Sequence, residues 1–118
     1  ASFCMLNNIN FTVTQMAEAL AAVTGFPYTV AEIAQAGERL WQLKHGINLL
    51  LGATAADDRL PPRLMEPLDD GPTASSVPDM GLMLAEFYAL RGLDDDGRPA
   101  RDRLERLGLL DLADALGR

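Results

Sequence analysis

The most restrictive feature of this sequence is a proline-rich segment in the middle of the chain. Between Ala53 and Pro78 lie five of the seven prolines, interleaved with two Asp-Asp pairs and Gly71. Proline breaks both a helix interior and a central strand, so the segment predicts a long extended crossover loop. Loops of this length inside compact domains are uncommon, and they are usually functional or lie over a neighbouring surface.

Helical patterns flank this loop on both sides. Thr12 with Gln15, and Thr29 with Glu32, are capping-box pairs that predict helices ending near Gly25 and Gly52. Beyond the loop, Ser76 and Asp79, with Pro78 at the first turn, should open a helix that is capped at Ser76 and ends at Gly92. Its expected buried set is Leu82, Met83, Phe87 and Leu90. Two short helices, from Pro99 to Gly108 and from Asp111 to Leu116, should complete the chain. No period-two strand pattern or internal repeat appears, so we predict an all-α fold of four to five helices over residues 1–118.

Charge is distributed unevenly along the chain. The segment from Ala1 to Ala56 holds five of the 27 charged residues, together with Phe11, Phe26 and Trp41. This charge-poor half is either an internally buried helix pair or a surface covered by other protein. The abrupt apolar start favours the second interpretation, in which the chain is part of something longer. Gly37 and Gly46 inside the second helix indicate close packing of another backbone.

Composition excludes several classes of protein. The net charge of −7 has the wrong sign for binding a phosphate backbone, so nucleic acid is not expected as a partner. Apolar runs are too short to span a bilayer, and no signal sequence opens the chain, which favours a cytoplasmic location. One cysteine, Cys4, and one histidine, His45, provide neither a disulfide nor an autonomous metal site.

The residues alone indicate no self-sufficient active site. His45 is interpreted as a helix-face residue, and the acidic groups near Asp57, Asp69 and Asp94 as solvated turns. Cys4, in an apolar segment, would by itself be a small buried hydrophobe.

A succession of segments nevertheless resembles the C-terminal end of the aldehyde:ferredoxin oxidoreductase family, whose members are tungstopterin iron-sulfur enzymes. The central pieces are a Gly-Glu-Arg helix, an Asp-x-Leu-Pro-x-Arg loop and a Glu-Phe-Tyr-x-x-Arg-Gly helix. The matching segments, in order, are Thr24-Gly25, Thr29–Glu32, Ala36–Leu43, Asn48, Gly52, Asp58–Arg63, Leu84–Gly92, Asp96-Gly97 and Leu107–Leu109. The chain departs from the family pattern at Ser2, Ile47, Leu50 and Leu93.

The resemblance implies a role for Cys4. It stands where the family has its last cluster-ligating cysteine, which would make it the fourth thiolate of a [4Fe-4S] cluster. The other three thiolates and the tungsten (or molybdenum) bis-pterin would then belong to upstream domains of the same protein. The implied activity is oxidation of an aldehyde to a carboxylic acid with electron transfer to ferredoxin, in a possible homo-oligomer.

Two functional hypotheses follow. In the first, the chain is the C-terminal part of such an oxidoreductase, and the isolated 118 residues are inactive and bind neither cluster nor pterin. In the second, it is an autonomous acidic helical module that serves as an interaction or scaffold unit.

Overall fold

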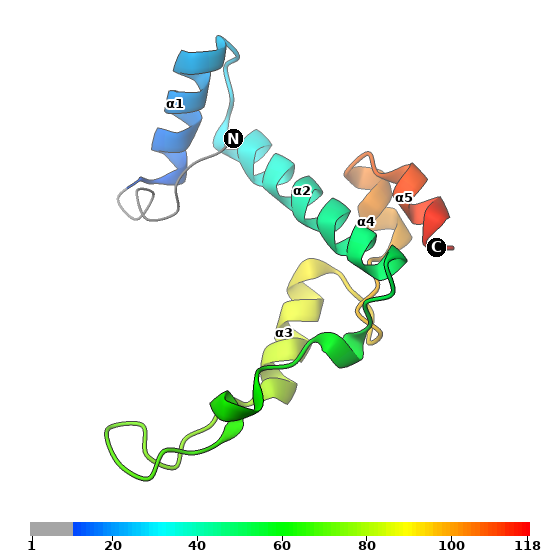
Figure 1. Cartoon of the computed structure of the whole chain (residues 1–118). Helices are drawn as coiled ribbons and strands as arrows, with labels where there is room; N and C mark the ends of the chain where they lie inside the picture. Colours follow the sequence, from blue (N-terminus) through cyan, green and yellow to red (C-terminus); the bar gives the residue numbers. More distant parts are fainter. Residues whose placement is uncertain (1–10) are drawn as a thin grey trace. The chain divides into compact units, whose positions relative to one another are not determined.

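A computed structural model of the chain describes residues 11–118 and is all-α over that range (Figure 1). The predicted fold class is confirmed, because five α-helices and two short 3-10 helices are present and the described residues form no strand. The chain divides into two compact units, Ala1–Trp41 and Gln42–Arg118, which we describe separately. None of the helices in the described part is long and apolar enough to cross a membrane.

The first helix, α1 (Val13–Thr24), begins and ends where the sequence predicts. The Gln15 N–H donates to the Thr12 hydroxyl (3.2 Å), and the Thr12 N–H donates to the Gln15 side-chain oxygen (2.9 Å). At the other end, Gly25 adopts φ 77°, a left-handed conformation that glycine reaches without a Cβ penalty.

The second helix, α2 (Val30–Leu50), also begins at its predicted capping box. The Glu32 carboxylate accepts from both the backbone N–H (2.7 Å) and the hydroxyl (2.8 Å) of Thr29. These bonds lower the pKa of Glu32, the backbone one most strongly. Residues up to Trp41 belong to the first unit, and the rest of α2 belongs to the second.

The first unit buries little of its own apolar surface. Ala17 is the only buried residue of α1, whereas Val23 is 85% exposed and Leu40 is 59% exposed. The alternative of an internally buried helix pair is therefore wrong for these residues. Most of their apolar side chains are exposed within the described residues.

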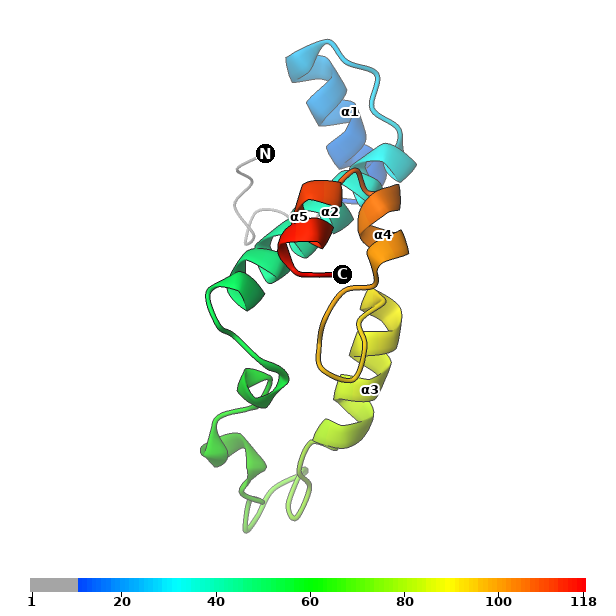
Figure 2. The ribbon, with the colours of Figure 1, turned by 90° about the vertical axis from the view of Figure 1, so that its right-hand side faces the viewer.

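The second unit has a small core made by α4 (Arg101–Arg106), α5 (Leu110–Ala115) and the end of α2 (Figure 2). The core consists of four buried residues with two partly buried leucines packed on them: Leu104, Leu112, Ala113 and Leu116, with Leu49 and Leu109. Ion pairs at i,i+4 spacing, Arg101 with Glu105 and Asp102 with Arg106, lie on the exposed faces, as the charge pattern predicts.

The two helix-interior glycines of α2 behave differently. A Cβ built on Gly46 would lie 2.6 Å from a Leu112 methyl group, so α2 and α5 approach closely at that point. The neighbour is a side chain, however, and not the backbone that the sequence suggested. Gly37 has nothing described within 4 Å of the same position, so the close packing expected there is not made by any described segment.

The third helix, α3 (Met80–Arg91), corrects one predicted cap. Its N-cap is Asp79, whose carboxylate accepts from the Leu82 N–H (3.0 Å), and not Ser76, because Pro78 separates Ser76 from the helix. At its C-terminus, the fully buried Gln42 donates through Nε2 to the Arg91 carbonyl (2.8 Å). This bond satisfies one of the carbonyls that every helix end leaves without an intrahelical donor.

The predicted buried set of α3 is also wrong within the described residues. Leu82, Met83 and Leu90 are 56%, 51% and 73% exposed, and Phe87 is 39% exposed. The helix is apolar on most of its sides, and Leu82, Met83 and Leu90 are more than half exposed. Helices of this composition are normally enclosed by other protein.

The crossover loop is present as predicted. It is interrupted by two single-turn 3-10 helices, η2 (Ala55–Asp57) and η3 (Pro62–Met65). Pro61 and Pro62 stand at the start of η3, where a missing backbone N–H costs nothing.

Candidate functional site

The predicted metal ligand, Cys4, lies outside the described residues. Within residues 11–118, no group of three or more histidine, cysteine, aspartate and glutamate side chains could hold a metal ion. The geometry that can be described is instead a set of polar contacts joining segments distant in the sequence. It lies in the second unit.

One contact joins the crossover loop to α3. The Tyr88 hydroxyl donates to the Asp58 carboxylate over 2.6 Å, across 30 residues of sequence. Burial, and then the hydrogen bond and negative charge of Asp58, raise the pKa of Tyr88 to about 12. The phenol is therefore neutral at physiological pH and acts as a fixed donor that holds the loop on α3.

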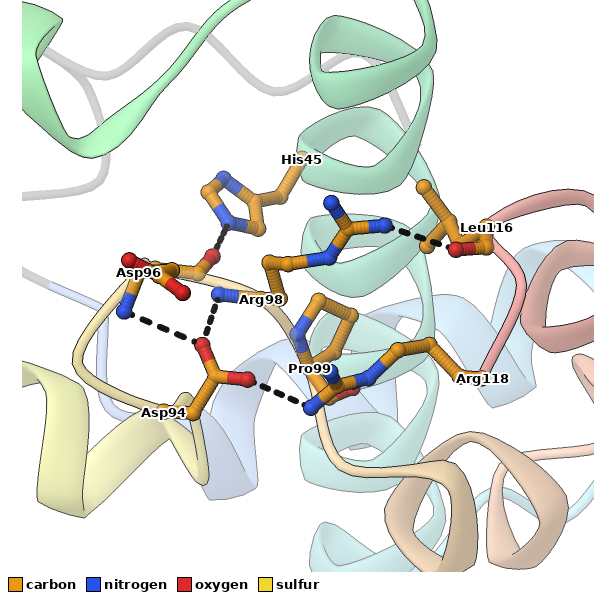
Figure 3. A network of polar contacts seen from close by, with 8 residues as sticks. His45, Asp94, Asp96, Arg98, Pro99, Leu116 and Arg118 are labelled. Carbon is orange, nitrogen blue, oxygen red and sulfur yellow. Dashed lines mark hydrogen bonds and ion pairs between the residues drawn. The ribbon is translucent and has the colours of Figure 1, made fainter.

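A second contact joins α2 to the turn that follows α3 (Figure 3). The His45 ring donates through Nε2 to the Gly97 carbonyl over 2.7 Å, which requires a proton on that nitrogen. Gly97 is buried with φ 72°, and a Cβ there would lie 3.2 Å from the Tyr88 hydroxyl oxygen. The glycine therefore lets the turn approach Tyr88 closely.

A third set of contacts fixes the same turn to the last residue, Arg118. The Asp94 carboxylate accepts from the backbone N–H groups of Asp96 (3.1 Å) and Arg98 (2.9 Å), and pairs with the Arg118 guanidinium (2.5 Å). Arg118 also donates to the Pro99 carbonyl (3.2 Å). Burial opposes ionisation of Asp94, but the Arg98 N–H and the Arg118 guanidinium outweigh it, so the pKa of Asp94 is lowered.

We call these contacting residues the polar junction: His45, Asp58, Tyr88, Asp94, Gly97 and Arg118. They form three separate pairs: His45 with Gly97, Tyr88 with Asp58, and Arg118 with Asp94. Together these contacts attach α2, the crossover loop and the C-terminal residue to α3 and the turn that follows it. The junction offers a structural function for His45, which sits on a helix face as the sequence predicts.

Sequence reasoning missed the carboxylates of this junction. Asp58 is exposed and Asp94 is partly exposed, as expected for solvated residues, but each also makes a contact that the sequence did not predict: Asp58 binds Tyr88, and Asp94 binds Arg118. Asp57 likewise caps η2 through Thr54. One feature of the sequence could have indicated these contacts: Asp58, Tyr88 and Gly97 all fall within the segments that carry the family resemblance.

Comparison with known proteins identifies the family. The family model described as "Aldehyde ferredoxin oxidoreductase, domains 2 & 3" matches residues 1–109. The tungsten-containing aldehyde ferredoxin oxidoreductases of Pyrococcus furiosus and Thermococcus kodakarensis are each 32% identical over 111 residues, which cover 92% of this chain and 18% of each relative. The aliphatic sulfonate oxidoreductase, WOR-like subunit, of Pyrococcus furiosus is 34% identical over 98 residues, covering 75% of this chain and 16% of that protein.

The chain thus spans about a fifth of the length of these relatives. Both the Asp58–Arg63 loop and the Leu84–Gly92 helix, whose side chains meet in the polar junction, lie inside the matched range. The predicted resemblance is confirmed, and the chain belongs to the aldehyde ferredoxin oxidoreductase family.

Proposed function

We propose that this chain is the C-terminal helical part of an oxidoreductase that oxidises aldehydes to carboxylic acids and passes the electrons to ferredoxin. The observation that supports this proposal is the match of residues 1–109 to domains 2 and 3 of the family. Oxidoreductase chemistry is a property of the family, whereas the aldehyde substrate and the ferredoxin acceptor are inferred from the relatives' names.

The proposal assigns Cys4 as one thiolate ligand of a [4Fe-4S] cluster. Such a cluster requires four thiolates, and the chain has a single cysteine. The other three, and the residues that hold a tungsten or molybdenum bis-pterin, are assigned to upstream domains. When bound, the pterin-held metal supplies the two-electron chemistry, and the protein contributes binding and orientation.

The described residues are assigned a supporting role in this enzyme. The 11–118 segment contains no metal-holding cluster, and its polar junction joins four segments of the fold. A fixed helical framework of this kind keeps neighbouring ligand and substrate residues within the small tolerances that catalysis requires.

The test uses the full-length protein purified without oxygen. We expect tungsten or molybdenum together with iron in the preparation, and ferredoxin reduction that depends on added aldehyde. Parallel assays with aliphatic sulfonates probe the second substrate class that occurs among the relatives. A full-length protein with neither metal and no redox activity would contradict the proposal and favour the autonomous interaction module.

A further inference from the structure

The first unit contains an open groove between α1 and the first half of α2. Its volume is about 680 Å³. Most of the side chains that line it are apolar: Met16, Leu20, Tyr28, Ile33, Ala36 and Leu40. Tyr28 and Leu40 are 39% and 59% exposed, so the described residues leave this apolar surface open to solvent.

The polar residues at the groove do not indicate a charged or hydrophilic ligand. The polar side chains that line it are Glu32, Gln35 and Arg39. Glu32 already bonds twice to Thr29 in the capping box of α2. Between Val13 and Trp41, only four residues are charged: Glu18, Glu32, Glu38 and Arg39. A concave apolar surface with so few charges fits an apolar protein segment better than an ionic small molecule.

We propose that the groove holds an apolar helix from the upstream part of the full-length protein. This inference rests on the proposed function, and the relatives support it because about four fifths of their length lies outside the region matched by this chain. The apolar side chains that α1 and α2 contribute to this groove form the kind of surface on which a third helix packs at an interaxial distance of about 8–10 Å. The small residues Ala36 and Gly37 on α2 permit such an approach, since nothing described lies within 4 Å of a Cβ at Gly37.

The experiment places a photoreactive benzophenone amino acid at single positions of the full-length protein. One variant is Leu40→p-benzoylphenylalanine, inside the groove. The matched control is Val23→p-benzoylphenylalanine, on α1 but outside the groove lining, at a side chain that is 85% exposed. After irradiation, mass spectrometry identifies the peptide bonded to each position.

We expect the Leu40 position to crosslink, at least several-fold more than the Val23 position, to one peptide that precedes residue 1. Crosslinks between two copies of this chain, or equal and diffuse products at both positions, would overturn the assignment. Peroxide oxidation of the native Met16, which lines the groove, gives a second measurement that requires no substitution. Met16 should be oxidised at least tenfold more slowly in the native protein than in urea, and equal rates would also overturn the proposal.

These readouts are independent of cofactor content and activity. An aldehyde-oxidising protein whose Leu40 position gives no upstream crosslink refutes the groove assignment alone. A protein that gives the crosslink but has no redox activity refutes the proposed function alone.

Discussion

Tyr88 provides a single hydrogen bond between the crossover loop and α3, so its hydroxyl can be tested in isolation. Tyr88→Phe should lower the free energy of unfolding by about 1 kcal/mol, because it removes a bond to a carboxylate that is itself exposed to solvent. The measurement is urea denaturation followed by circular dichroism. Tyr28→Phe is the matched control and should leave the free energy unchanged, and an equal loss in both variants would count against the Tyr88 bond.

The same residue predicts a dependence of stability on alkaline pH. The pKa of Tyr88 is raised from an ordinary value of 10.0 to about 12 in the folded chain, by burial first and then by Asp58. The stabilisation that results is complete below pH 10 and is lost as pH rises toward 12, since the unfolded chain ionises first. Tyr88→Phe should flatten this part of the stability curve.

Asp94 gives the corresponding prediction in acid. Its lowered pKa means that the stability it contributes is present above pH 3.8 and is lost as pH falls through the lower folded value. Asp94→Asn should cost about 1 kcal/mol at neutral pH, a figure reduced for solvent screening because the Asp94 side chain is 37% exposed. Asp95→Asn alters an exposed neighbour and serves as the control in the same denaturation assay. Equal effects of the two substitutions would contradict a special role for Asp94.

At the scale of elements, substitution of the two glycines of α2 by alanine should change stability in opposite directions. Gly46→Ala places a methyl group 2.6 Å from Leu112, and the resulting overpacking, about 1–3 kcal/mol, should exceed the gain in helix propensity of about 1 kcal/mol. Gly37→Ala meets nothing described within 4 Å and should stabilise the chain by up to about 1 kcal/mol. Thermal unfolding of both variants tests the packing of α2 on α5, and stabilisation by Gly46→Ala would refute it.

Helix starts and stops could be predicted from the sequence because their determinants are local. The capping boxes at Thr12 and Thr29 involve partners three residues away, and Gly25 and Gly92 end their helices by their own left-handed backbone. The polar junction could not be predicted in this way, because Asp58 and His45 reach partners 30 and 52 residues away. The burial of α3 was mispredicted because an apolar pattern identifies a face to be covered but not which polypeptide covers it.

At the scale of the whole molecule, the segment with few charged residues is also the one whose helices expose apolar side chains. The charge-poor first 56 residues supply α1 and α2, whose apolar side chains are exposed in the first unit, whereas the ion pairs of α4 and α5 lie on exposed faces of the second. A chain that left so much apolar surface uncovered would be prone to associate, since burial of each large side chain contributes about 1.5–3 kcal/mol. Membership of a family whose matched relatives are about five times longer supplies a reason for this surface.

The central claim, that this chain completes the iron-sulfur site of a longer oxidoreductase, is tested most directly at Cys4. The measurement is electron paramagnetic resonance of the dithionite-reduced full-length protein carrying Cys4→Ser, with Met5→Leu as a control that removes a neighbouring sulfur. We predict a lost or altered [4Fe-4S] signal and impaired electron transfer in Cys4→Ser, because a serine oxygen is a harder and poorer ligand for iron than a thiolate. The circular dichroism of the helices should persist, since their caps do not involve Cys4. A wild-type cluster signal with unaltered aldehyde oxidation in Cys4→Ser would contradict the account.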